Sequence, residues 1–184
     1  MHQFTFNTAF SVVCEPGAAL ALARHCKDLA IERIMLVTDP GIISLGIEQP
    51  IVNNLQQAGI SVELYSEVEA DPPEHVVLAA AQAARQAAIQ GVIGLGGGSS
   101  MDVAKLVSVL ANSTQPLQQM YGIGNVRGQR LPLIQVPTTA GTGSEVTMVS
   151  IITTGETTKT GVISKQLLPD VAVLDAELTL GLPE

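Results

Sequence analysis

The feature that most constrains this chain is a run of small residues, Gly-Leu-Gly-Gly-Gly-Ser-Ser at 94–100, that interrupts two apolar segments. The residues before it, 91–95, predict a buried strand, and apolar residues recur at helical spacing from Met101 to Leu110. Glycines at the end of a strand let the backbone approach a ligand closely, and a helix N-terminus presents unpaired N–H groups to an anion. The run therefore predicts a strand–loop–helix unit that binds a phosphate or diphosphate group.

Neither common phosphate-binding fingerprint fits this loop. A G-x-G-x-x-G motif starting at Gly94 needs glycine at position 99, where the chain has Ser99, and no lysine stands where a P-loop requires one. An alternative interpretation is a plain strand-to-helix turn, with Ser99 as the helix cap and Asp102 as the acid of the first turn. Both interpretations stay open from these residues alone.

The remaining pattern predicts an α/β fold: a Rossmann-like, mostly parallel sheet flanked by helices, with a short β-hairpin. Apolar runs between turn signals predict strands, and longer periodic segments predict helices. The expected helices are 18–29, 51–58, 75–90 and 101–110; the expected strands are 33–39, 60–65, 91–95 and 131–136, with shorter ones at 146–153, 161–164 and 171–175. Residues 112–130 show no regular pattern.

Asp39 is a second candidate ligand because it stands at the carboxyl end of a predicted strand. An aspartate in that place can accept hydrogen bonds from both hydroxyls of an adenosine ribose and would repel a 2′-phosphate. The usual fingerprint has this acid about 20 residues after the glycine loop, whereas Asp39 precedes the loop. The alternative is that Asp39-Pro-Gly is only a turn.

A loop rich in small hydroxyl residues, Pro-Thr-Thr-Ala-Gly-Thr-Gly-Ser-Glu at 137–145, follows another predicted strand. It places several hydrogen-bonding groups at the sheet edge where open α/β sheets bind ligands. The alternative is a polar loop of turn formers. Lys159 lies between threonines, where a lone lysine is typical of a solvated hairpin.

Composition excludes several classes of function. The chain has 9 basic and 17 acidic residues and a net charge of −8, which argues against binding nucleic acid or an anionic membrane. All three histidines lie at or before position 75, so the later part cannot form a Ser-His-Asp triad or a histidine-rich metal site. Two cysteines, no signal-peptide pattern and no long apolar window favour a cytoplasmic protein.

Together these features resemble the iron-containing (group III) alcohol dehydrogenase family, within the dehydroquinate-synthase-like superfamily. The resemblance rests on Asp39, Gly-Gly-Gly-Ser-x-x-Asp-x-x-Lys at 96–105, Pro-Thr-Thr-Ala-Gly-Thr-Gly-Ser-Glu-Val-Thr at 137–147, Lys159 and Pro-Asp-x-Ala-x-Leu-Asp-x-Glu-Leu at 169–178. It implies an N-terminal domain that binds NAD(P) and a helical C-terminal domain in which an aspartate and three histidines hold Fe²⁺ or Zn²⁺.

The resemblance also implies a role for particular residues. Asp39 would bind the adenosine ribose and favour NAD over NADP, the glycine loop would hold the diphosphate, and Lys159 would bind a ribose. Several family members have asparagine at the position of Asp71, and no cofactor contact is assigned to it. The full implied cofactor set is Asp39, Gly96, Gly97, Gly98, Ser99, Asp102, Thr138, Thr139, Thr142, Thr147, Lys159, Leu178 and Gly181.

By this resemblance, residues 1–178 form the NAD-binding domain and 179–184 begin the hinge to a helical metal-binding domain that is absent. The four metal ligands are expected beyond Glu184, and no catalytic residue is assigned within the chain. The parent would be a homo-oligomeric, NAD-dependent and metal-dependent alcohol dehydrogenase that interconverts primary alcohols and aldehydes by hydride transfer. The chain alone would bind NAD(H) without turnover.

Two alternatives stay open. Glycerol dehydrogenase and maleylacetate reductase belong to the same superfamily but differ from this chain around 137–142. A non-catalytic nucleotide-binding module is the other alternative. The charged content of 14% argues against a self-sufficient module, because it predicts apolar surface that a second domain would cover.

Overall fold

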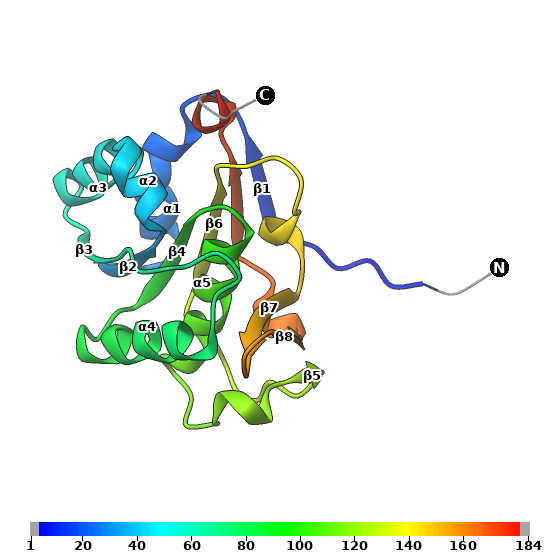
Figure 1. The fold of residues 1–184 in the computed structure, drawn as a ribbon. Coiled ribbons are helices and arrows are strands. Elements are labelled where there is room, and N and C mark those ends of the chain that lie inside the picture. Colours follow the sequence, from blue (N-terminus) through cyan, green and yellow to red (C-terminus); the bar gives the residue numbers. More distant parts are fainter. Residues whose placement is uncertain (1–3, 181–184) are drawn as a thin grey trace.

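The centre of the fold is a six-stranded, fully parallel sheet, seen in a computed structural model that describes residues 4–180 (Figure 1). The strand order is β1-β9-β6-β4-β2-β3. The strands are β1 Ser11–Cys14, β2 Arg33–Val37, β3 Ser61–Tyr65, β4 Gly91–Gly96, β6 Leu133–Pro137 and β9 Val171–Leu174. The predicted Rossmann-like class is confirmed.

Helices cover both faces of this sheet (Figure 1). The α-helices are α1 Leu22–Asp28, α2 Pro40–Leu45, α3 Glu48–Gln57, α4 Glu74–Gln86 and α5 Gly98–Leu110. Short 3-10 helices are η1 Ala18–Ala21, η2 Leu117–Gln119, η3 Ser144–Val146, η4 Lys165–Leu167 and η5 Ala176–Thr179.

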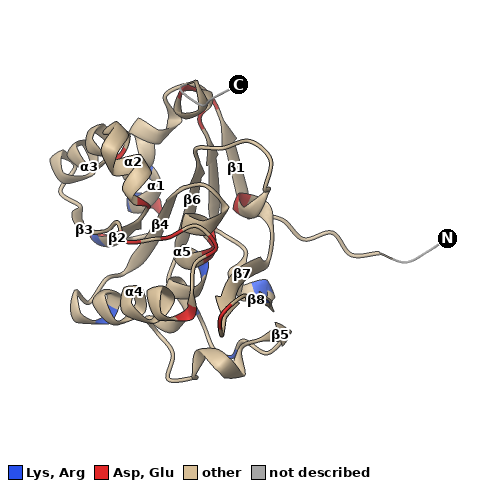
Figure 2. Ribbon diagram, viewed as in Figure 1, with Lys and Arg blue, Asp and Glu red and all other residues tan. Residues whose placement is uncertain are grey.

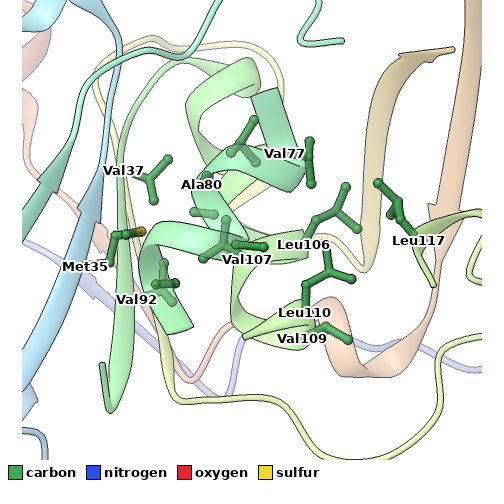
Figure 3. Packing of buried hydrophobic residues seen from close by; sticks show 14 of the residues in the cluster. Met35, Val37, Val77, Ala80, Val92, Leu106, Val107, Val109, Leu110 and Leu117 are labelled. Atoms are coloured by element: carbon green, nitrogen blue, oxygen red, sulfur yellow. The ribbon is translucent and has the colours of Figure 1, made fainter. Parts of the chain in front are cut away.

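Strand β2 shows how the two cores divide. Ile34 and Leu36 pack in the cluster that contains residues of α1 and α3, whereas Met35 and Val37 pack in the cluster that contains residues of α4 and α5. Figure 3 shows the second cluster, with Met35 and Val37 close to side chains of both helices. A strand buried on both faces reads as a continuous apolar run, which is why the sequence predicts it well.

A small second sheet packs against α5 and contains the predicted hairpin. It consists of β5 Gly122–Ile123, β7 Val149–Thr154 and β8 Thr158–Ile163, in the order β5-β8-β7. Strands β7 and β8 are antiparallel, and the backbone N–H of Ile151 donates to Oδ2 of Asp102 on α5 over 2.9 Å. This bond ties the hairpin to the helix that follows the glycine loop.

The structure differs from the sequence prediction at several element ends. Helix α5 begins at Gly98 rather than Met101, and its N-cap is Gly97, so the interpretation of Ser99 as the cap is wrong. Helix α4 ends at Gln86 because Ala88 has a left-handed backbone, with φ of 47°. Asp39-Pro-Gly is not only a turn but the start of α2, with Asp39 as N-cap and proline in the first turn.

The sheet has a topological switch point beside β2. The chain passes from β2 to β3 on one side and then crosses back to β4 on the other side of β2. Ligands of open α/β sheets bind where the strand order reverses, outside the carboxyl ends of the strands. The residues that follow β2 and β4 are Asp39 and the glycine loop, so the fold brings these two sequence-predicted features to the same place.

Candidate functional site

Gly96, the last residue of β4, has a conformation and surroundings that demand glycine. Its φ is 142°, which residues with a Cβ rarely adopt. A Cβ there would lie 2.7 Å from Oγ of Ser100 and 3.0 Å from Oδ2 of Asp39. Gly96 therefore lets the start of α5 pack directly against the end of β2.

The first turn of α5 is open to an anion. Gly97 caps the helix with an extended backbone, and no side chain accepts a hydrogen bond from the first N–H groups. Gly98 is also close-packed, since a Cβ there would lie 3.1 Å from Cγ2 of Thr142. A helix of 13 residues with an uncapped, glycine-flanked N-terminus fits a diphosphate group through its N–H donors and its dipole.

Asp39 borders a first cavity of about 600 Å³ in front of this turn. Its Oδ1 accepts from the N–H groups of Gly41 at 2.9 Å and Ile42 at 3.1 Å, and its Oδ2 accepts from the Ser100 hydroxyl at 3.0 Å. The carboxylate is thus fixed in place by both helices. The lining residues, shared between α2, α5, the segment after β3 and the loop after β6, are Asp39, Pro40, Gly41, Ile42, Leu45, Val68, Glu69, Ala70, Gly97, Gly98, Ser99, Ser100, Thr138 and Thr139.

A second cavity of about 670 Å³ lies on the other side of the α5 N-terminus and shares Gly98 and Ser99 with the first. The hairpin forms part of its wall, and Lys159 of β8 forms an exposed ion pair with Asp71. The cavity is lined by Asp71, Pro72, Gly98, Ser99, Asp102, Thr142, Ser144, Thr147, Val149, Ile151 and Lys159. An extended ligand that crosses the helix N-terminus would enter both cavities.

A third cavity, of about 380 Å³, lies beside the loop after β6 and at the carboxyl ends of β1 and β9. Its lining is largely apolar and includes Pro16, Pro137, Ala140 and Leu174. Thr139 borders both this cavity and the first. Apolar surface therefore exists next to the hydroxyl-rich loop.

Asp102 lines the second cavity but has both carboxylate oxygens occupied within the protein. Oδ1 accepts from the Ser144 hydroxyl at 2.7 Å and lies 3.6 Å from Nζ of Lys105, while Oδ2 accepts from the Ile151 N–H. Burial raises the pKa of this carboxyl, and the Lys105 ammonium opposes that effect. Asp102 thus holds the loop and hairpin against α5.

The structure brings most of the sequence-predicted residues to the first and second cavities and leaves others outside them. Leu178 lines none of these three cavities and instead packs beside the apolar cluster of α1 and α3. Gly181 lies outside the described residues, and Gly96 lies beneath the loop. Those that line the first or second cavity are Asp39, Gly97, Gly98, Ser99, Asp102, Thr138, Thr139, Thr142, Thr147 and Lys159.

Three polar residues at the site have no role assigned from the sequence: Ser100, Lys105 and Ser144, although the motifs at 96–105 and 137–147 include the last two. Lys105 is fully buried, and the side chains that accept its hydrogen bonds lie about forty positions further on. A signal was present, because Lys105 is the one charged residue from Val103 to Leu110, where only Ser108 is also polar. A lysine in such a stretch needs buried acceptors.

The donor set of the implied metal is not found in residues 4–180. No three His, Cys, Asp or Glu side chains of that range are grouped so that they could hold a metal ion. Both thiols are free, and burial raises the pKa of Cys26 to about 12, which disfavours the thiolate that a metal needs. The described residues therefore fit the cofactor but not the metal.

Charged residues are sparse along the ribbon, most of which carries neither sign (Figure 2). Acidic and basic groups near the first and second cavities lie at Asp39, Glu69, Asp71, Asp102, Lys105 and Lys159, so an anionic ligand would be bound mainly through backbone N–H groups. Within the described range, no helix combines the length and hydrophobicity needed to cross a membrane.

Comparison with known proteins agrees with this geometry. The chain is 36% identical over 181 residues to sulfoacetaldehyde reductase of Bilophila wadsworthia, covering 98% of this chain and 47% of that protein. It is 40% identical over 171 residues to 4-hydroxybutyrate dehydrogenase of Cupriavidus necator, and the match covers 91% of this chain and 44% of that protein. The structure of sulfoacetaldehyde reductase from Bifidobacterium kashiwanohense in complex with NAD⁺ superimposes with a TM-score of 0.91 at 27% identity. This match covers 100% of this chain and 49% of the reductase chain.

The chain thus spans about half the length of these relatives. The family model described as iron-containing alcohol dehydrogenase matches residues 10–176, which is nearly all of the described range. Fold, site geometry and relatives agree, and the chain belongs to the iron-containing alcohol dehydrogenase family.

Proposed function

We propose that this chain is the cofactor-binding part of an NAD-dependent, metal-dependent alcohol dehydrogenase. In this proposal residues 1–178 are the NAD-binding domain and 179–184 begin the hinge to a helical metal-binding domain. The observation that carries it is the uncapped N-terminus of α5, which lies at the switch point between a fixed carboxylate, Asp39, and a hydroxyl-rich loop. A relative that was crystallised with NAD⁺ has the same fold over the whole chain.

The two cavities support an extended dinucleotide. The adenosine ribose would lie in the first cavity, where Asp39 accepts hydroxyl protons and repels a 2′-phosphate. The diphosphate would cross Gly97, Gly98 and Ser99, and the second ribose would enter the second cavity beside Lys159. Thr138, Thr139, Thr142 and Thr147 supply hydroxyl groups along this path.

Bound NAD supplies the hydride acceptor for oxidation of an alcohol carbon. The residues of this chain bind and orient that cofactor; the metal that polarises the alcohol oxygen would be held by residues outside the described range. The proposed substrates of the complete homo-oligomeric enzyme are primary alcohols and aldehydes. The chain alone would bind NAD(H) and would not turn over an alcohol.

A thermal-shift titration of the pure chain with NAD, NADP and ADP-ribose tests the cofactor part. A ligand that binds only the folded state raises Tm, so we expect NAD and ADP-ribose to raise Tm and NADP to raise it less. Equal stabilisation by NAD and NADP would overturn the role of Asp39, and no shift with NAD would overturn the proposed function. Metal-dependent alcohol oxidation by the pure chain would contradict the lack of turnover.

A further inference from the structure

Lys105 is an ammonium group sealed inside the protein beside the second cavity. It has no exposed surface, and its neighbours on α5 other than Asp102 are apolar or small. A buried ammonium is strongly unfavourable unless it is paired and hydrogen-bonded. The hydrogen bonds of the Lys105 ammonium therefore show which residues it holds in place.

All three protons of the Lys105 ammonium are used. Nζ donates to Oγ of Ser144 at 2.8 Å, to Oγ1 of Thr147 at 3.3 Å and to the carbonyl oxygen of Val149 at 2.6 Å. The acceptors come from η3, from the residue that follows it and from the first residue of β7. One side chain thus fixes the end of the hydroxyl-rich loop and the start of the hairpin to α5.

Because an ammonium cannot accept a hydrogen bond, these contacts fix the direction of the hydroxyl protons. The Ser144 hydroxyl accepts a hydrogen bond from Lys105 and donates one to Oδ1 of Asp102 over 2.7 Å. Thr147 also accepts from Lys105, so its proton points elsewhere, and the protein acceptor it reaches is the Ser144 carbonyl oxygen at the long distance of 3.5 Å. Thr147 lines the second cavity, where a better acceptor on a ligand would take that proton.

We infer that Lys105 is a positioning residue that sets Thr147 as a hydrogen-bond donor toward an oxygen acceptor of the ligand in the second cavity. Lys105 does not line any of the three cavities, so it acts through Thr147 and Ser144 without contacting the ligand. This inference rests on the proposed function, in which the second cavity receives the second ribose and the nicotinamide of NAD. In that cavity, a ribose oxygen or the carboxamide oxygen of NAD could accept the Thr147 proton.

Calorimetric titration of the full chain with NAD and with ADP tests the inference, because ADP would occupy the first cavity and the α5 N-terminus but not the second cavity. For K105M we expect the Kd of NAD to rise about tenfold, the effect of one lost hydrogen bond, while the Kd of ADP stays unchanged. T147V should give the same pattern, and T147S should restore NAD binding. The double variant of K105M and T147V should lose no more NAD affinity than T147V alone.

Lys165→Met is a matched control, because Lys165 is an exposed lysine that lines none of the three cavities. If K105M does not fold, the comparison of T147V with T147S replaces it, since both variants keep Lys105. NAD binding by K105M or T147V that equals wild type, an equal loss of NAD and ADP affinity, or additive losses in the double variant would each overturn the inference alone. A wild-type chain that does not bind NAD would overturn the proposed function and this inference with it.

Discussion

The buried hydroxyl of Ser100 donates a hydrogen bond to Oδ2 of Asp39 over 3.0 Å, between residues 61 positions apart in the sequence. It joins the first turn of α5 to the first turn of α2. Since Oδ1 of Asp39 already caps α2, the carboxylate is held in one orientation without any ligand. Asp39 is therefore both a structural cap and the proposed ribose-binding group, and these two roles can be separated by mutation.

Asp39→Asn should change cofactor preference without much change in stability. Asparagine caps helices about as well as aspartate, but it does not repel a 2′-phosphate. We expect the ratio of NADP to NAD affinity to rise by about tenfold, measured by titration calorimetry. Asp39→Ala is the control: it removes the cap and should reduce the free energy of unfolding by about 1 kcal/mol. An unchanged affinity ratio in Asp39→Asn would contradict the ribose role.

Gly96→Ala and Gly97→Ala form a matched pair one residue apart. At Gly96 the φ of 142° and the close approach of Ser100 should make alanine destabilising by about 2 kcal/mol or more. At Gly97 the φ is −77° and a Cβ would lie 3.6 Å from Oγ1 of Thr139, an ordinary contact. We therefore expect Gly97→Ala to fold normally in urea denaturation but to bind ADP more weakly, because the methyl group would occupy the anion cradle. Normal ADP binding by Gly97→Ala would argue against that cradle.

Lys105 should make stability depend on pH in the alkaline range. Burial lowers its pKa from 10.5 to about 8, although Asp102 and Glu145 oppose the shift. Between these two values the unfolded chain binds more protons than the folded one, so the free energy of unfolding contributed by this group rises with pH. Comparing wild type with K105M by urea denaturation, we expect the difference in unfolding free energy to shift in favour of wild type by about 3 kcal/mol between pH 8 and 10.5. A difference that does not vary with pH would show that Lys105 is not the titrating group.

Asp175 ties together two distant ends of the described fold. Its carboxylate accepts from the N–H groups of Gly17 at 2.9 Å, Ala19 at 3.0 Å and Glu177 at 3.1 Å, and the residue is only 4% exposed. Asp175→Ala leaves these donors, of which that of Ala19 is buried, without their partner and should reduce the free energy of unfolding by about 2–3 kcal/mol. Asp175→Asn keeps one acceptor oxygen and should lose less; equal losses in thermal denaturation would contradict this account.

The sequence predicts those strands best that are buried on both faces. The run Ile34–Val37 is apolar without interruption, and Leu133–Val136 is interrupted only by the buried Gln135; each forms a central strand. The edge strand β1 escaped prediction because three of its four residues are exposed and its order is imposed by pairing with β9. Helix α2 escaped because Asp-Pro-Gly begins turns and helices alike.

For the site, the sequence identifies residues that stand directly after strands, because their place follows from local order. Asp39, the glycine loop and the 137–145 loop are of this kind. The hydrogen-bond acceptors of Ser100 and Lys105 could not be predicted, since they lie 61 positions before Ser100 and 39 to 44 positions after Lys105. Only the packing of α5 against α2 and the hairpin brings them together.

Helix α5 turns by about 100° per residue. Within its first eight residues it presents free N–H groups at the proposed anion site, Ser100 to Asp39, Asp102 to the hairpin, and Lys105 to the loop before that hairpin. A single inserted or deleted residue between Ser100 and Lys105 would rotate the later contacts away from their partners while leaving the earlier ones in place. Between Ser100 and Lys105, residues that make none of these contacts can vary, but the number of residues is fixed by the fold.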